Sequence, residues 1–559
     1  MKYRMTQNLI AIAVSLLGTT ALNADSLCTI SGVVRDKQKT VVTAVVITAK
    51  KLDDGSIRKA ITGPDGAYQI PQIPSGIYSV TAEKAGYAQL AASPLQIEPG
   101  KAVAYDLTID PAVTNIVTKG FWPRLAKAYA DDWHDRGGGG PDPKVRGYQA
   151  PESNPPYPFT VWPYGGSPVI GQPNTNLPPL MAALYNGPHG EWWQNSKVQI
   201  YGWVDTGFNV SSSNKGEFAN APAAYDVKPN TVTLDQAVLY IERVPDTVQT
   251  DHFDWGFRVS GLYGQDYRYT TSKGILSNQL LGENSLYGFD PVMIYADLYF
   301  PKVADGMNVR IGRYVSLPDI EAQLAPNNYT YSHSLLYIYD CYTQSGINVT
   351  TKLSDHWMIQ TGLSGGCDAA IWTKDATPTG TFCGSYTWSE GGDNIYLCAN
   401  SVNKNKYAYN NLAAYYLTWY HKINSKWHYD TEFWYQYERD VPSIFGTAPI
   451  ENGANGAWCN PGQQYCFAPE WATTNYVERQ FGKKDAFSIR NEVFDDLRGQ
   501  RTGTKTFYSE HLISWTHFIG TTMLFRPEIR YERSYDNPAF DLQTKKNQFT
   551  VAGDMVFFF

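Results

Sequence analysis

Charged residues recur at every second position in several segments of the C-terminal two-thirds of the chain. The sequence FRPEIRYE at 525–532 shows the pattern clearly, because Arg526, Glu528, Arg530 and Glu532 alternate with apolar or aromatic residues. Successive side chains of a β-strand point to opposite faces, so these four charges would share one face. A charge that points at lipid costs about 2–4 kcal/mol near the bilayer midplane. If such a strand lies in a membrane, we therefore expect its charged face to contact water.

Other segments carry ionisable residues at equivalent positions, and we predict that all of these residues point into the lumen of a barrel. The predicted lumen-facing set is Asp205, Arg258, Asp297, Arg310, Lys352, Asp430, Glu432, Arg490, Glu492, Arg526, Glu528, Arg530, Glu532 and Asp554. The lining of a channel decides what passes, so such a set suits ions and small polar solutes. The alternative is a plugged barrel, in which the interior charges pair with one another and are structural.

The long segment 317–340 is the candidate for narrowing this lumen. It follows Arg310 and Arg313, and it carries Asp319 and Glu321. If the segment folds inward, we expect Asp319 and Glu321 to face the two arginines. Opposite charges on two sides of a channel would set up a transverse field at a constriction.

The elements that position these residues are strands of about ten residues, the length that a tilted membrane strand requires. Alternating runs start near 197, 231, 253, 291, 307, 341, 355, 406, 427, 470, 485, 505, 521 and 547. Short connections such as 301–306 alternate with long ones such as 317–340 and 368–405. We therefore predict an all-β fold, a transmembrane antiparallel barrel over 196–559 with about fourteen strands; bacterial barrels have even numbers, and twelve or sixteen stay open.

The two ends of the sequence indicate export to a membrane. Residues 1–24 combine a basic start, an apolar core and small residues, as a secretory signal peptide does. The segment 547–559 alternates in the same way as the other runs and finishes on Phe557 and Phe559. We expect it to close the barrel, with Phe557 and Phe559 as the signal for the barrel-assembly machinery. The predicted location is the outer membrane of a Gram-negative-type bacterium, in contact with outer-membrane lipid.

Composition argues against several other functions. A net charge of −7 and a pI near 5.8 do not suit nucleic acid, which requires a basic patch. The nine His are scattered, with neither CxxC spacing nor a nucleophile motif, so we predict no enzyme, no metal and no other cofactor. The 40 Tyr and 16 Trp are expected mainly on the outer face and in loops, as a girdle where membrane meets water.

Seven cysteines in an exported protein permit disulfides. The candidate pairs, in order of preference, are Cys459 with Cys466, Cys383 with Cys398, and Cys341 with Cys367. The first pair lies in a stretch rich in Gly, Pro and Asn, where the chain can turn back on itself.

Residues 28–110 form a separate unit. Short runs rich in Val, Ile and Tyr alternate with turns, which predicts a small β-sandwich. The pieces GVVRD at 32–36, TGPDGAY at 62–68 and IPSGIYSV at 73–80 resemble the carboxypeptidase regulatory-like domain, which implies a non-catalytic accessory module. We expect a folded spacer, with binding of a glycan or a partner protein as the alternative.

Residues 111–195 are predicted to be a Gly/Pro-rich linker with short helices. Phe121, Leu125, Tyr129 and Trp133 recur at helical spacing, which predicts one amphipathic helix over 121–133. Glycines at 137–140 and the Pro-rich run at 151–179 disfavour both helix and sheet.

The barrel segment is similar to the OmpL-like β-barrel porin family. The resemblance is carried by WPYGG at 162–166, RIGRY at 310–314, the segment 318–340, RNE at 490–492 and FRPEIRYE at 525–532. It implies a porin that gives passive diffusion of small hydrophilic solutes, either as a monomer or as a homo-oligomer. A sugar-selective channel and a barrel-anchored envelope attachment protein, whose N-terminal sandwich binds a partner or glycan, are the alternatives.

Overall fold

The computed structural model describes most of the chain outside the predicted signal peptide and linker. The described residues are 28–109, 120–133 and 178–559, with gaps at 37–38, 44, 53–56, 64, 85–92, 100, 224, 246, 248–250, 317–318, 323, 355, 389–392, 425, 482–483 and 521. The predicted signal peptide, the four glycines at 137–140 and nearly all of the Pro-rich run lie outside the described residues. Among the residues described, no helix has the length and apolar character needed to cross a membrane.

The N-terminal unit is a sandwich of two four-stranded sheets. One sheet contains β4 (Ala67–Ile73), β1 (Cys28–Arg35), β7 (Ala102–Ala104) and β8 (Leu107–Thr108), and the other contains β3 (Ile57–Ile61), β2 (Val46–Lys51), β5 (Gly76–Glu83) and β6 (Ser93–Ile97). Ile30 and Val34 of the first sheet are fully buried in one core with Ile47 and Val80 of the second. The predicted small β-sandwich is therefore confirmed.

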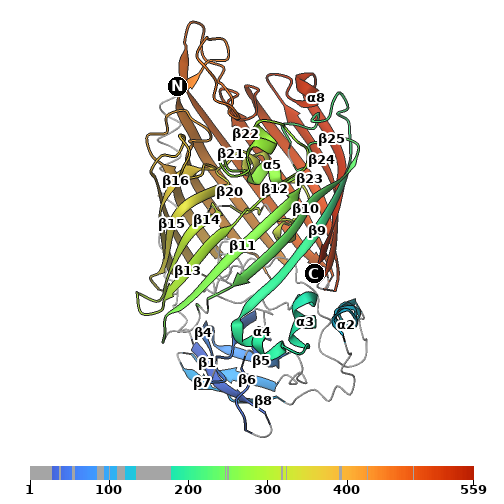
Figure 1. The fold of residues 1–559 in the computed structure, drawn as a ribbon, viewed down its shortest axis with the longest axis vertical. Helices are drawn as coiled ribbons and strands as arrows, with labels where there is room; N and C mark the ends of the chain where they lie inside the picture. The colour runs from blue at the N-terminus through green and yellow to red at the C-terminus, as the bar shows by residue number, and fades with distance from the viewer. Residues whose placement is uncertain are drawn as a thin grey trace.

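In the part of the chain that the structure describes, three short helices precede the barrel. They are α2 (Phe121–Trp133), α3 (Pro179–Tyr185) and α4 (Gly190–Ser196), and α2 has the bounds that its spacing predicted. Arg124 in α2 donates from Nε to the carbonyl oxygen of Ala183 in α3, at 2.8 Å. After α4, Lys197 takes a left-handed conformation (φ 57°) and the first barrel strand begins at the next residue. The helices lie below one end of the barrel (Figure 1).

The rest of the chain forms one closed barrel (Figure 1). Its strands are β9 (Val198–Ser211), β10 (Val232–Arg243), β11 (Asp254–Gly264), β12 (Gly288–Asp290), β13 (Ile294–Phe300), β14 (Met307–Val315), β15 (Thr343–Lys352), β16 (Trp357–Cys367), β17 (Thr379–Trp388), β18 (Asp393–Val402), β19 (Ala413–Lys422), β20 (Trp427–Pro442), β21 (Tyr465–Phe481), β22 (Asp485–Asp496), β23 (Thr506–Ile519), β24 (Met523–Ser534) and β25 (Asn547–Phe558). The pairing is antiparallel throughout, and β25 pairs with β9.

Long loops and short turns separate to opposite ends of this barrel, and we call these ends the long-loop end and the short-turn end. The long loops contain α5 (Tyr267–Thr270), α6 (Asn278–Leu281), the 3-10 turn η2 (Ala325–Asn327), α7 (Leu335–Ile338) and α8 (Phe540–Gln543). The C-terminus lies at the short-turn end, close to α2 and α3 (Figure 1).

Two of the seventeen strand segments behave as one interrupted strand. β12 pairs with the end of β11, where Asp290 lies opposite Leu262, and β13 pairs with its beginning, where Tyr299 lies opposite Asp254. The break contains Pro291, which has no N–H to donate to a ladder. The barrel therefore has sixteen strands, inside the predicted range of twelve to sixteen but more than the fourteen counted from the sequence.

The alternation does not predict β17 and β18, which lie in the stretch 368–405 that is expected to be a long loop. The outward face of β17 carries Gly380, Phe382 and Gly384, so glycines interrupt the apolar stripe that reveals a membrane strand. Phe382 is 59% exposed there, as a lipid-facing side chain is expected to be. These two strands form one hairpin, and they account for the difference between the fourteen strands predicted and the sixteen present.

Three disulfides tie the long-loop half of the barrel. The structure joins Cys459 to Cys466, Cys383 to Cys398, and Cys341 to Cys367. The second pair links β17 to β18 at directly opposed positions of the ladder. Cys28, the remaining cysteine, is buried in the sandwich core.

The last strand closes the barrel as predicted from its alternation. Thr550 lies opposite Ser211 and Phe558 lies opposite Trp203. Val551 and Met555 are 39% and 49% exposed on the outer face, whereas Asp554 is fully buried on the inner face. Alternate residues of β25 thus point either to an apolar outer face, which suits lipid, or to the polar interior.

Beyond this ladder, Gly202 and Phe559 exchange two backbone hydrogen bonds, with N···O distances of 3.2 and 2.9 Å. A Cβ atom on Gly202 would lie 2.0 Å from the carbonyl oxygen of Val238 and 2.7 Å from the Phe559 ring. The final contact of the closing strand therefore depends on glycine at position 202.

We predict that Gly202→Ala lowers the stability of the barrel by about 1–3 kcal/mol, the usual cost of forcing an extra methyl group into filled space. The measurement is the urea midpoint of the refolded protein, read from its heat-modifiable migration on a gel. Gly384→Ala is the matched control, because the nearest atom to its Cβ is 3.8 Å away. Equal midpoints for the two variants would contradict this account of closure.

Candidate functional site

The ionisable residues predicted to line the lumen all lie in the barrel interior or in the loop that enters it. Among the residues of the predicted site, Lys352, Arg258 and Asp319 are the most exposed, at 7% each, and Asp430 and Glu432 are fully buried. Neighbouring residues of opposite parity, such as Phe433 at 42% and Ile529 at 52%, are exposed on the outer surface. The charged face predicted from sequence is thus the inner face.

The loop between β14 and β15, residues 316–342, folds into the barrel, and we call it the inner loop. Leu324, Leu335 and Leu336 of this loop are buried in one cluster with Trp434 and Tyr476 of the barrel wall. Other wall aromatics inside this cluster are Tyr240, Tyr295, Tyr396 and Tyr416. These aromatic side chains lie in the interior, away from the outer face and loops expected for most Tyr and Trp, because the inner loop supplies an apolar surface within the lumen.

Carboxylates of the wall bind backbone amides of the inner loop. Glu528 accepts from the N–H groups of Tyr331 and Ser332, at 3.0 and 3.1 Å. Glu492 accepts from Leu335 and Leu336, at 2.8 and 2.5 Å, where α7 begins. Glu432 accepts from Ile320 in the same way, at 2.8 Å. Such charge-assisted bonds are stronger than neutral ones, so they fix the path of the loop.

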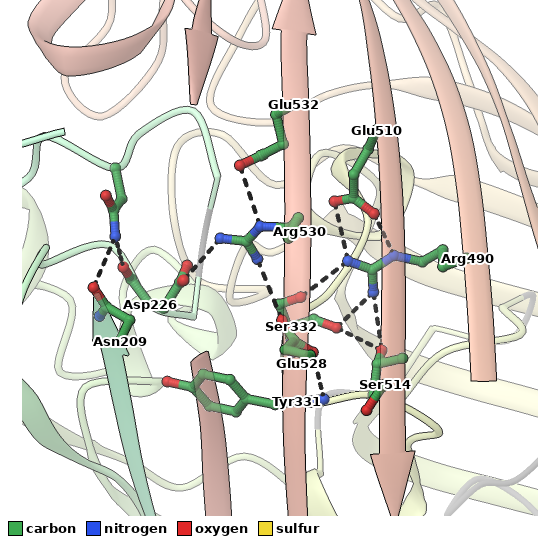
Figure 2. A network of polar contacts seen from close by, with 12 residues as sticks. Asn209, Asp226, Tyr331, Ser332, Arg490, Glu510, Ser514, Glu528, Arg530 and Glu532 are labelled. Atoms are coloured by element: carbon green, nitrogen blue, oxygen red, sulfur yellow. Dashed lines mark hydrogen bonds and ion pairs between the residues drawn. The ribbon is translucent and has the colours of Figure 1, made fainter. Parts of the chain in front are cut away.

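Arginines of the barrel wall donate hydrogen bonds to backbone carbonyl oxygens of the inner loop. Arg490 donates to the Ser332 carbonyl at 2.5 Å and is held by a two-bond contact with Glu510, at 2.6 and 3.0 Å (Figure 2). Arg526 donates to the carbonyls of Ala325 and Asn328, at 2.7 and 2.8 Å. Acids and bases that alternate along the wall therefore meet both the donors and the acceptors of the inner-loop backbone.

A second loop, 212–231, is held by β24, the strand that carries Arg526. Arg530 of β24 contacts Asp226 at 2.7 Å and Glu532 at 3.1 Å, between the two loops (Figure 2). Asp226 and Arg530 are both buried. Two long loops thus converge on one line of lumen charges.

In the structure, Asp319 and Glu321 do not face Arg310 and Arg313, which were their predicted partners. Glu321 accepts from the Tyr476 hydroxyl at 2.7 Å and lies 3.7 Å from Arg490. The inner loop runs across to the strands β20–β24, so these residues do not meet the arginines on β14. The partners of those arginines are Asp297 for Arg310, at 2.9 Å, and Asp290 for Arg313, at 3.0 Å.

Carboxylates far outnumber basic side chains in the described interior. Besides the predicted acids, Asp226, Asp235, Glu242, Asp266, Asp290, Asp340, Glu438, Glu470, Glu478, Asp496 and Glu510 are buried. Among residues 198–559 that the structure describes, the buried Lys and Arg are Arg258, Arg310, Arg313, Lys352, Arg490, Arg526 and Arg530. The described interior is therefore rich in acidic groups.

Sequence reasoning missed several residues that hold the loops. Glu510 has the inward parity of β23, so its alternation could have revealed it. Asp226 and Tyr331 lie in loops, and no periodic signal marks them; Tyr331 donates from its hydroxyl to Asp235 at 3.0 Å.

His428, Asp430 and Glu478 form the one group among the described residues with metal-ligand geometry, since their ligand atoms lie within 4.8 Å of one another. His428 and Glu478 face each other across β20 and β21, a register that the sequence alone does not reveal. A His with two carboxylates could hold a divalent cation. However, His428 Nε2 contacts Glu478 and Asp430 contacts Tyr329, so the three side chains already have protein partners.

Comparisons with known proteins found a match for the N-terminal domain and several similar solved structures. Residues 29–110 match the carboxypeptidase regulatory-like domain. The anion-selective porin from Comamonas acidovorans is similar at 10% identity, with 65% of this chain and 99% of that chain covered and a TM-score of 0.42. The outer membrane channel DcaP of Acinetobacter baumannii is similar at 11% identity, with 64% and 97% covered and a TM-score of 0.41.

With TM-scores this low, neither likeness supports an inference about this protein. Among curated proteins, none matches the chain. The family match covers the whole barrel, because residues 197–559 match the family described as "Putative beta-barrel porin-2, OmpL-like". By this match and by its closed sixteen-strand barrel, the chain belongs to the OmpL-like family of outer-membrane β-barrel porins.

Proposed function

We propose that the protein gives passive diffusion of small hydrophilic solutes across the outer membrane, with a preference for cations. The observation that carries the proposal is the strongly acidic interior, crossed by an inner loop that is held at both its amides and its carbonyls. A charged inner face and an apolar outer face suit a polar path through lipid. The inner loop fills much of the lumen, which limits passage to ions and small molecules.

The orientation forms part of the same proposal. Short turns of outer-membrane barrels lie on the periplasmic side and long loops lie outside. The helices α2–α4 adjoin the short-turn end, so we place the N-terminal sandwich in the periplasm. Phe557 and Phe559 at this end would be the residues that the barrel-assembly machinery recognises.

A closed barrel that serves as an envelope anchor is the second candidate. The observation in its favour is the complete burial of Arg490 and Glu432 beneath the inner loop. Liposome swelling with sugars of graded size separates the candidates: entry that falls with size supports the porin, and absence of flux supports the anchor. Preference for one sugar would instead support a sugar-selective channel, since aromatic residues also line the interior.

If the inner loop narrows the lumen, its release should widen the path. We predict that the double variant Arg490→Gln with Glu510→Gln raises single-channel conductance by roughly twofold or more and speeds entry of the larger sugars, because conductance depends on the open cross-section. Replacing both partners removes the bonds to Ser332 and does not leave Glu510 as a buried charge without Arg490.

The matched control for this variant is Arg243→Gln with Asp254→Asn. That ion pair, at 2.8 Å, joins the two wall strands β10 and β11 near the short-turn end. Its loss should leave conductance unchanged. If both double variants conduct like the unmodified protein, the inner loop does not control the path.

Cation preference should depend on the acids of the inner loop. We predict that Asp319→Asn with Glu321→Gln lowers the potassium-to-chloride permeability ratio by roughly a factor of two or more, since lumen charges create local potentials of several kT. The measurement is the zero-current potential of planar bilayers across a KCl gradient.

Glu217→Gln is the control for this measurement, because Glu217 is exposed in the loop 212–231, where it pairs with Lys228 at 3.2 Å. The ratio should stay unchanged in this control. A channel that prefers chloride, or a ratio that is insensitive to the inner-loop acids, would refute the cation preference.

A further inference from the structure

We propose that helix α2 lies on the inner-leaflet surface of the membrane, beside the barrel, and that Trp122 inserts at the boundary between headgroups and acyl chains. The partner is thus a phospholipid surface. The proposal rests on where α2 contacts the barrel, which face it uses, and what that face carries beyond the contact. It goes beyond the proposed channel function, because it concerns attachment of the segment that precedes the barrel.

The contact is with the lipid-facing rim of the closing strand. Tyr129 stacks on Phe557 with ring centroids 5.2 Å apart, and its hydroxyl donates to the carbonyl oxygen of Phe558 at 3.0 Å. Phe557 has the same outward parity as Met555, which is 49% exposed on the barrel surface. Tyr129 therefore reaches the outer side of the rim, where the bilayer begins, and not the lumen.

A second contact fixes the direction of the helix. Trp133 donates from its indole nitrogen to the Thr522 hydroxyl at 2.8 Å, and that hydroxyl donates to Asp132 at 2.7 Å. Thr522 lies in the turn between β23 and β24, at the short-turn end. The C-terminal half of α2 is thus tied to the rim at the end of β25 and at the neighbouring turn between β23 and β24.

Trp122 shares the face that makes these contacts. Positions 122, 126, 129 and 133 follow the 4-3-4 spacing that aligns residues along one side of a helix. Trp122 lies seven residues before Tyr129, a rise of about 10 Å. Its side chain is 74% exposed. The helix face that contacts the rim therefore extends beyond the barrel and there presents an exposed indole ring.

The opposite face is suited to water. Lys127 and Asp131 form an exposed ion pair at 2.6 Å on that side. A helix with an aromatic stripe and a charged back is typical of segments that lie in the plane of the membrane interface, where Trp is favoured. Continuity with the lipid-facing surface of the barrel makes the phospholipid leaflet the occupant of the Trp122 side.

The test is site-specific photocrosslinking of the full-length protein in phospholipid vesicles. Trp122→p-benzoylphenylalanine is irradiated, and lipid adducts on the heat-modifiable folded band are measured by mass spectrometry. Leu363→p-benzoylphenylalanine is the positive control, because Leu363 is 61% exposed on the outer face of β16. Trp372→p-benzoylphenylalanine is the negative control, since Trp372 is 70% exposed in a loop at the long-loop end.

We expect the lipid-adduct yield at position 122 to match that at 363 and to exceed that at 372 severalfold. A yield at 122 as low as at 372 would overturn the proposal. A crosslink from position 122 to a second protein chain, without lipid adducts, would also overturn it, because the exposed indole would then mark a protein interface.

Discussion

The interior of this barrel depends on charged side chains that are removed from water and bound to the backbone of the inner loop. Glu528 accepts hydrogen bonds from two successive backbone amides of that loop. Arg490 donates to the carbonyl oxygen that follows them and is itself held by Glu510. A buried carboxylate or guanidinium without partners would cost several kcal/mol. The loop therefore needs the wall for its path, and the wall needs the loop to satisfy its charges.

Strand β24 concentrates these contacts. Arg526 and Glu528 bind the inner loop, and Arg530 binds Asp226 of the loop 212–231. Consecutive inward positions of one strand thus organise two long loops, while the outward positions between them are apolar. The same alternation that makes the strand compatible with lipid spaces the charges that fill the lumen.

Local alternation was enough to predict the inward face of β24 and the closing strand, because parity depends only on neighbouring residues. It failed at β17, where Gly380 and Gly384 remove the apolar side chains that carry the signal. Partners across the lumen could not be predicted, since they depend on the route of the inner loop. Glu321 meets Tyr476 and Arg490 for that reason, and the neighbours of Arg310 and Arg313 are the wall acids Asp297 and Asp290.

The inner loop also has a consequence for the order of assembly. It lies between β14 and β15, yet the groups that hold it, Glu492, Glu528 and Arg526, follow it by 156 to 201 residues. Contacts of such sequence separation form late, because the intervening chain must first be ordered. The contacts that hold the inner loop can therefore form only once the C-terminal hairpins are in place, so the lumen acquires its final shape at that stage.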